Sequence, residues 1–251
     1  MTQREPFAIS VQPDDVSCGP ASLHAVYNHL GLDVTLAQVA RSVRRLPHRG
    51  TLAVYLGLDA LWRGLAATIY TCNLHLFDPT WFQDDAPELA EKLAAQMQAK
   101  PARDRRLQQT SRAYLEYLAA GGKVRMQDIT PDLLVRLIGQ GPVVAGLSET
   151  WLYRCRRESP ATGQPDDVAG KPGGHFVVFH ACEPGGQAIH IADPWRQLPY
   201  PGSHHYVMPI WRVIGAVMLG IVTYDAKLLV IQPPDAGSCK ENEDGEPACR
   251  Q

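Results

Sequence analysis

Residues 12–23 read Gln-Pro-Asp-Asp-Val-Ser-Cys-Gly-Pro-Ala-Ser-Leu, a polar turn that brings one cysteine to the start of an apolar run. Ser17 suits the N-cap of a helix, and Pro20 suits the first turn, where a missing N–H costs nothing. Apolar residues then recur at helical spacing, at Leu23, Val26, Tyr27 and Leu30. The spacing predicts a helix that begins at Cys18. Its free N–H groups and dipole would favour the thiolate, the nucleophilic form of cysteine.

A buried structural cysteine is the alternative to a nucleophile at this position. Free cysteine is among the residues most often buried, so a helix start alone does not decide between the two. A thiol that attacks a carbonyl also needs a base, a group that orients the base, and donors for the developing oxyanion. The rest of the chain must therefore supply these three parts.

Length and composition exclude several classes of protein. The chain has 251 residues, 45% of them hydrophobic and 20% charged, which suffices for one good core and is short for two full domains. A formal net charge of -2 lacks the positive excess that binding to nucleic acid or to an anionic membrane requires. The charged start lacks a secretory signal, and no apolar run reaches the ~20 residues of a membrane span. We expect a cytoplasmic protein with no nucleic-acid or membrane partner.

The order of predicted elements places helices before strands. Helices are predicted from Cys18 to about Gly31, over residues 35–45, and from Thr51 onward. This order favours an α+β fold, in which an N-terminal helical half packs on a C-terminal antiparallel sheet.

The predicted sheet is built mainly from the second half of the chain. Residues 143–147 form a buried strand, and residues 175–182 and 188–193 form a β-hairpin around a Pro-Gly-Gly turn. We also predict a strand over 220–224 and an edge strand over 228–231. Between residues 154 and 174 lies a polar loop rich in glycine and proline.

One domain is expected over residues 1–232, followed by a disordered acidic tail over 233–251. Two helical stretches form an insertion at about 79–121, which could pack as a helical hairpin or lie over the body as a flap. The six cysteines lack the spacing of a zinc ribbon or the density of a disulfide scaffold. Cys239 and Cys249, both in the tail, could pair only under oxidising conditions.

Three further residues supply the parts that a nucleophilic Cys18 requires. His175 begins a strand directly after two glycines, where it can act as the base. Asp193 ends the partner strand of the hairpin, and antiparallel pairing can bring it level with His175 to hold the imidazole tautomer. Gln12 lies six positions before Cys18, so the turn can fold its amide back beside the sulfur as an oxyanion donor. Each also has a plainer interpretation, as a strand-end histidine, a turn-forming aspartate and a loop glutamine.

Metal binding is the alternative chemistry for this histidine-rich region. His180 and Cys182 share one face of the predicted strand, whereas His175 lies on the other face. His204 and His205 add no helical or strand pair of ligands. We therefore expect no metal and no cofactor.

The chain resembles the bacteriocin-processing, double-glycine leader peptidases, a family of papain-like cysteine peptidases. The resemblance lies in Gln12 followed after five residues by Cys18-Gly19-Pro20-Ala21, in Gly174-His175-Phe176-Val177-Val178, and in Asp193-Pro194. It implies a papain-like fold, with Cys18 as nucleophile, His175 as general base and acid, Asp193 as the orienting residue and Gln12 in the oxyanion hole. Ser17 departs from the family pattern, which commonly has Asp there.

The resemblance and the residues together predict a cysteine peptidase that acts on a peptide or protein through an acyl-enzyme. The same acyl-enzyme could pass to an amine, which would make the protein an acyltransferase or transpeptidase. A catalytically silent peptide-binding module is the third possibility, and retention of all four reactive positions argues against it.

Overall fold

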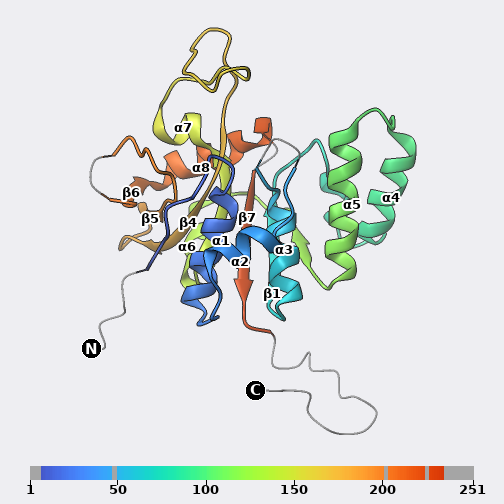
Figure 1. Ribbon diagram of the computed structural model, residues 1–251. Helices are drawn as coiled ribbons and strands as arrows, with labels where there is room; N and C mark the ends of the chain where they lie inside the picture. Colours follow the sequence, from blue (N-terminus) through green and yellow to red (C-terminus); the bar gives the residue numbers. More distant parts are fainter. Residues whose placement is uncertain (1–6, 47–49, 201–202, 224–225, 235–251) are drawn as a thin grey trace, which may run out of the picture.

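A central sheet with helices on both faces forms the body of the protein, seen in a computed structural model (Figure 1). It describes residues 7–46, 50–200, 203–223 and 226–234. The predicted tail therefore lies outside the described residues apart from its first two positions, as do Cys239 and Cys249. Within the described residues no helix combines the length and the apolarity that crossing a membrane requires.

The sheet has seven strands in the described residues, in the order β2-β1-β7-β3-β4-β5-β6. The strands are β1 (Ala66–Thr71), β2 (Lys123–Arg125), β3 (Val143–Ser148), β4 (Gly174–Cys182), β5 (Ala188–Ala192), β6 (His205–Pro209) and β7 (Lys227–Gln232). Only the pair β1 and β2 is parallel, and the other five pairs are antiparallel. The sheet is thus mixed, with the predicted antiparallel hairpin intact as β4 and β5.

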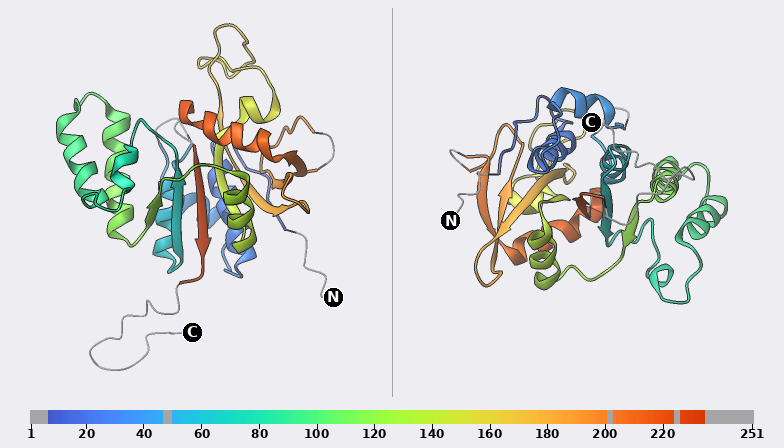
Figure 2. Two further views of the ribbon diagram at one scale, coloured as in Figure 1. Left: turned by 180° about the vertical axis from the view of Figure 1, so that it is seen from behind. Right: turned by 90° about the horizontal axis from the view of Figure 1, so that it is seen from below.

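Helices cover both faces of this sheet (Figure 2). One face packs against α1 (Cys18–His29) and α3 (Ala53–Trp62), with α2 (Leu36–Ser42) packed on α1, and the other packs against α6 (Pro131–Gln140) and α8 (Ile210–Leu219). Alternate residues of each central strand enter opposite cores: Val144 and Val178 face the first group of helices, whereas Ala145 and Val177 face the second. The predicted combination of an early helical group with a later sheet is confirmed, and helices lie on both sides of it.

Two strand predictions near the C-terminus are wrong. Residues 228–231 form the core of β7, which is a central strand between β1 and β3 and not an edge. Their unbroken apolar sequence fits this position, because a strand covered on both faces shows no polar alternation. Residues Gly220–Thr223 form a short 3-10 helix, η2, that continues the course of α8. Gly220 has helical backbone angles and packs close to β3, so the chain turns there before β7 begins.

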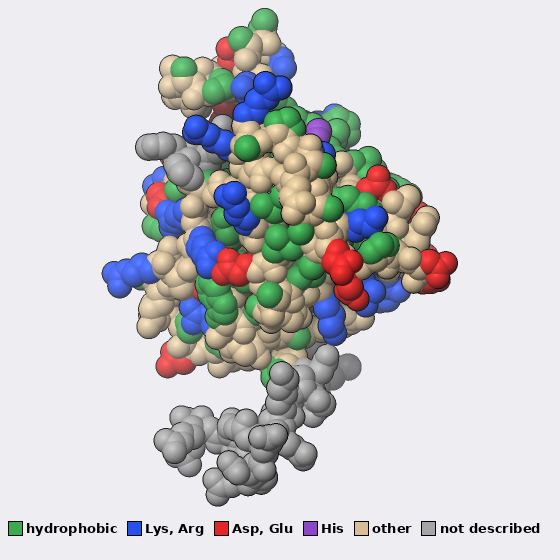
Figure 3. All heavy atoms as spheres, turned by 90° about the vertical axis from the view of Figure 1, so that its right-hand side faces the viewer, with side chains coloured by type: hydrophobic (Ala, Val, Ile, Leu, Met, Phe, Trp, Pro, Cys, Tyr) green, Lys and Arg blue, Asp and Glu red, His purple; other side chains and the backbone are tan. Residues whose placement is uncertain are grey.

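The insertion is a helical hairpin. It consists of the 3-10 helix η1 (Pro79–Phe82), α4 (Leu89–Ala99) and α5 (Arg105–Ala119), and it lies beside α3 at the β2 edge of the sheet (Figure 1). Acidic and basic side chains are interspersed over its outer surface (Figure 3). Of the two predicted arrangements, the packed hairpin is the one observed.

Tyr117 fastens this hairpin to the body of the protein. Its side chain is fully buried, and its hydroxyl donates to the carbonyl of Ala67 at 2.7 Å. Glycines leave room for the ring, because a Cβ on Gly57 or Gly122 would come within 2.7 or 2.4 Å of it. The hairpin is therefore anchored through α5 to both α3 and the first strand of the sheet.

Tyr117→Phe is expected to lower the free energy of unfolding by about 1–2 kcal/mol, because it removes a buried hydrogen bond while keeping the ring. Urea denaturation measures the loss. Tyr70→Phe, on β1 and only partly buried, is the matched control and should change stability by less. Equal midpoints for the wild type and Tyr117→Phe would show that the hydroxyl does not anchor the hairpin.

Candidate active site

Helix α1 begins at Cys18, as predicted, and the side chain of this cysteine is 8% exposed. The helix start is pressed against strand β4. Ser22 Oγ donates to the carbonyl of Phe176 at 3.1 Å, and a Cβ on Gly19 would lie 2.5 Å from the side chain of Thr51. Cys18 is thus held next to the strand that carries His175.

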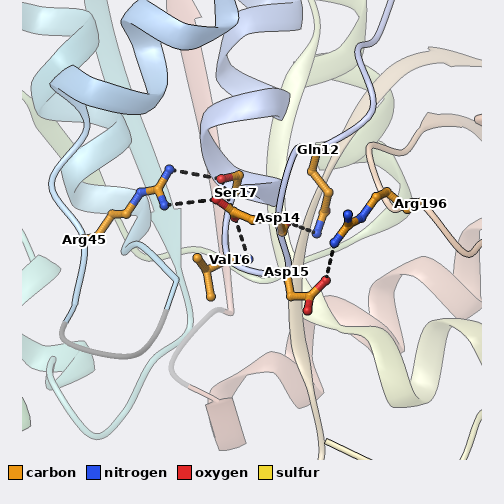
Figure 4. Close-up of polar contacts among 7 residues, drawn as sticks. All are labelled: Gln12, Asp14, Asp15, Val16, Ser17, Arg45 and Arg196. Atoms are coloured by element: carbon orange, nitrogen blue, oxygen red, sulfur yellow. Dashed lines mark hydrogen bonds and ion pairs between the residues drawn. The ribbon is translucent and has the colours of Figure 1, made fainter.

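The turn before Cys18 is fixed by a small polar network (Figure 4). The Asp14 carboxylate accepts hydrogen bonds from Ser17 Oγ at 2.5 Å and from the Val16 N–H at 3.0 Å. Arg45 donates to Ser17 Oγ at 3.0 Å. Ser17 occupies the predicted N-cap position, but its hydroxyl donates to Asp14 instead of capping the helix. Partial burial opposes ionisation of Asp14, yet the hydrogen bonds from Ser17 and Val16 and the charge of Arg45 lower its pKa.

Gln12 is buried beside this turn. Its backbone N–H donates to the carbonyl of Pro194 at 2.8 Å, and its Nε2 donates to the carbonyl of Asp14 at 2.8 Å. An amide nitrogen carries two hydrogens, so one remains for a further acceptor. Gln12, Cys18 and His175 line the same cavity. The amide is therefore placed where it can donate to an oxygen bound beside the sulfur.

His175 lies at the start of β4 and is 4% exposed. Its Nε2 is 2.9 Å from Asp193 Oδ1, which leaves Nδ1 as the nitrogen available to Cys18. Burial disfavours the charged imidazolium, but the charges of Asp193 and Cys18 and their hydrogen bonds raise the pKa of His175 well above 6.5. The imidazole thus interacts with both groups that the sequence assigned to it.

Asp193 follows the last residue of β5 and has no exposed surface. Hairpin pairing places Val178 opposite Ala192, so Asp193 reaches the His175 end of β4 as predicted. Burial opposes ionisation of this carboxyl, but the charge of His175 and hydrogen bonds from neighbouring side chains hold its pKa below 3.8. The structure therefore brings together all four residues that the sequence singled out.

Two tyrosines near this carboxylate were not anticipated from the sequence. Tyr153 and Tyr206 each direct a hydroxyl at Asp193 Oδ2. Tyr153 ends the short helix α7 (Glu149–Tyr153), and Tyr206 lies on β6, opposite Ile191 of β5. Neither stands at a recognisable spacing from Asp193 in the chain. Only the pairing of β5 with β6, which the sequence did not reveal, could have pointed to Tyr206.

Cys18 lines two cavities, with volumes of about 650 and 440 Å³. Both are lined by Cys18 and Gly174. The loop between α7 and β4, prominent at the top of Figure 1, borders both cavities. Its Pro160, Lys171 and Pro172 line the larger cavity, and Glu158, Gly163 and Gly173 line the smaller. Cys18 and this loop therefore contribute to both cavities.

Three further histidines, His180, His190 and His205, lie close together at the opposite end of the hairpin. The ring of His180 lies 5.9 Å from that of His190 and 5.5 Å from that of His205, and it stacks on Phe7. Burial and the neighbouring imidazoles lower the pKa of His180 to about 4. As placed, the described residues contain no group of three or more His, Cys, Asp or Glu side chains that could hold a metal ion.

Comparison with known proteins gave matches only among solved structures. No family model and no curated protein matches the chain. One similar structure is a double glycine motif protease from an AMS/PCAT transporter, solved in complex with the leader peptide. It is 15% identical, with a TM-score of 0.46, and the match covers 93% of this chain and 96% of that one. Another, from Bacillus anthracis, was solved as a C39-like peptidase; it is 12% identical, with a TM-score of 0.44 and coverage of 90% and 94%.

Proposed function

We propose that the chain is a papain-like cysteine peptidase that cleaves a peptide or isopeptide bond. One observation carries the proposal: the buried His175 imidazole bridges Cys18, at the start of a helix, and an Asp193 carboxylate with no exposed surface. A histidine that serves only the fold has no need of a thiol on one side and a buried carboxylate on the other. Nucleophile, base and orienting group are the arrangement that thiol catalysis requires.

In the acylation step, the Cys18 thiolate attacks the carbonyl carbon of the substrate and a C–S bond forms. The carbonyl electron pair moves to its oxygen, which accepts hydrogen bonds from the Gln12 amide and the Cys18 backbone N–H. When the intermediate collapses, the C–N bond breaks and the His175 imidazolium gives its proton to the leaving amine. The products of this step are a free amine and a thioester on Cys18.

In deacylation water is the nucleophile, and His175 acts first as a base and not as an acid. His175 takes a proton from the water molecule as its oxygen attacks the thioester carbon. The second tetrahedral intermediate then expels Cys18 as a thiolate, which restores the thiolate and imidazolium pair. Asp193 stays ionised throughout, because its part is to stabilise the imidazolium and to fix the ring.

The two cavities support a peptide as the substrate. Cys18 lines both, so an extended chain that occupies them can bring its scissile carbonyl to the sulfur. Processing of a small peptide precursor is the role that the motif resemblance favours. The same geometry serves transfer of the acyl group to an amine, so the experiment includes that outcome.

Competitive labelling with iodoacetamide tests the proposal at near-neutral pH. Cys18 is expected to react at least tenfold faster than Cys155, which is exposed and whose pKa is raised by burial and the nearby Glu149 charge. Mass spectrometry of the digested protein reads the two rates in one sample. Equal rates would refute an activated thiol and leave the silent peptide-binding module.

A peptide library incubated with and without an added amine then separates the two catalytic outcomes. Hydrolysis gives free carboxyl termini in both samples, whereas transfer gives amide products only where amine is present. We expect hydrolysis to dominate.

A further inference from the structure

We propose that the hydroxyls of Tyr153 and Tyr206 are positioning groups that keep the Asp193 carboxylate ionised and aimed at His175. The inference rests on the proposed function, and it adds two residues to the machinery that no motif marks. Neither tyrosine is placed to touch the substrate, because both act on the carboxylate behind the imidazole.

The hydrogen bonds around Asp193 divide evenly between its two oxygens. Oδ1 is 2.9 Å from His175 Nε2 and accepts from the Trp195 N–H at 3.0 Å. Oδ2 accepts from the Tyr153 hydroxyl at 2.5 Å and from the Tyr206 hydroxyl at 2.7 Å. The tyrosines come from α7 and β6, so separate elements fix the second oxygen. A carboxylate held by both oxygens cannot rotate about its terminal bond without losing donors, and Oδ1 therefore stays directed at His175.

Burial makes these donors necessary. Asp193 has no exposed surface, and a buried carboxylate without sufficient donors takes up a proton instead of ionising. Aromatic rings close the space where water could otherwise solvate it. The Tyr153 ring lies 5.1 Å from Trp195, and the Tyr206 ring lies 4.8 Å from Tyr200. Fixed hydroxyls thus take the place of solvent.

The titratable side chains around this carboxylate come from separate elements of the described residues. His175 faces it from β4, Tyr153 from α7 and Tyr206 from β6, while Tyr200 and His204 lie in the segment before β6. His204 contacts the backbone carbonyl of Asp193 through Nδ1, at 2.9 Å, and not the carboxylate. The guanidinium of Arg212 on α8 acts on Tyr200, whereas the side chains that act on Asp193 itself are His175, Tyr153 and Tyr206.

The expected effect of Tyr206→Phe follows from these contacts. The ionised carboxylate loses one hydrogen-bond donor, while burial still disfavours its charge. The pKa of Asp193 therefore rises. At a pH below the new value, Asp193 takes a proton and no longer stabilises the imidazolium at His175. The thiolate–imidazolium pair of Cys18 and His175 is then less stable relative to the neutral thiol and imidazole, so labelling of Cys18 slows. The pH midpoint of Cys18 labelling therefore moves upward, by about one unit for each hydroxyl removed.

The experiment measures the iodoacetamide labelling rate of Cys18 against pH in the full chain. It compares the wild type, Tyr206→Phe, Tyr153→Phe and the double variant. Tyr200→Phe is the matched control, because its ring packs on Tyr206 while its hydroxyl makes none of the four bonds to Asp193. The downfield proton resonance of His175 Nε2–H provides a second reading and is expected to shift in the two single variants but not in Tyr200→Phe.

The outcomes separate this inference from the proposed function. The positioning role alone is overturned if the wild type labels rapidly and all three variants, Tyr206→Phe, Tyr153→Phe and Tyr200→Phe, keep its pH midpoint and its His175 proton resonance. Slow wild-type labelling overturns both the role and the activity. A loss of folding in one tyrosine variant, seen by urea denaturation, leaves the other to decide, since each removes one donor from the same oxygen.

Discussion

Cys18→Ala is expected to abolish turnover of any peptide substrate, with a loss in kcat of at least about 10³-fold and up to about 10⁶-fold. The loss is large because no acyl-enzyme can form without the sulfur. The oxyanion donors then have no developing negative charge to stabilise. The fold should survive, since the change removes one atom from a side chain that is already 8% exposed.

Cleavage of a peptide identified from the library, followed by mass spectrometry, measures this loss. Cys182→Ala is the control, because Cys182 is a partly buried thiol at the far end of β4. Its turnover should match the wild type. If Cys18→Ala keeps more than a tenth of wild-type activity, another group is the nucleophile and the proposed chemistry is wrong.

Asp193→Asn is expected to lower kcat by about 10³- to 10⁴-fold while leaving the protein folded. The amide has nearly the shape of the carboxylate, but it carries no charge and can present a donor to His175 in the wrong tautomer. With the charge of Asp193 removed, the pKa of His175 falls. Because acylation uses protonated His175, the basic limb of the kcat/KM profile should then move to lower pH.

Glu183→Gln is a matched control for this change. Glu183 Oε1 lies 2.7 Å from His190 Nε2, so it forms a second contact between a carboxylate and a histidine, but on the surface of the same hairpin. Exposed pairs of this kind contribute little, and we expect activity within twofold of the wild type. A similar loss in both variants would mean that Asp193 acts through the stability of the hairpin and not through His175.

The parts of the site that were predictable from the sequence are those with local signals. The start of α1 follows from a polar turn, a proline and helical spacing around Cys18. The β4–β5 hairpin follows from alternating apolar residues around Gly185 and Gly186, both of which have the positive φ that glycine favours. Together these two local patterns place the three residues of the proposed triad, Cys18, His175 and Asp193.

The parts that could not be predicted depend on contacts between distant elements. β7 is central because it pairs with β1 on one side and β3 on the other, and neither partner is near it in the chain. Tyr206 reaches Asp193 because β6 pairs with β5 after an irregular segment. Ser17 was correctly placed at the helix start, but the Asp14 and Arg45 contacts that redirect its hydroxyl lie outside the reach of helix-capping rules.

The hydrogen bond from Ser22 to Phe176 has a consequence for how the protein could diversify. It joins the helix that carries Cys18 directly to the strand that carries His175. The loop that roofs both cavities stands outside this contact. Its length and side chains could therefore change, by natural drift or in a designed library, and reshape both cavities while this contact between helix and strand stays in place.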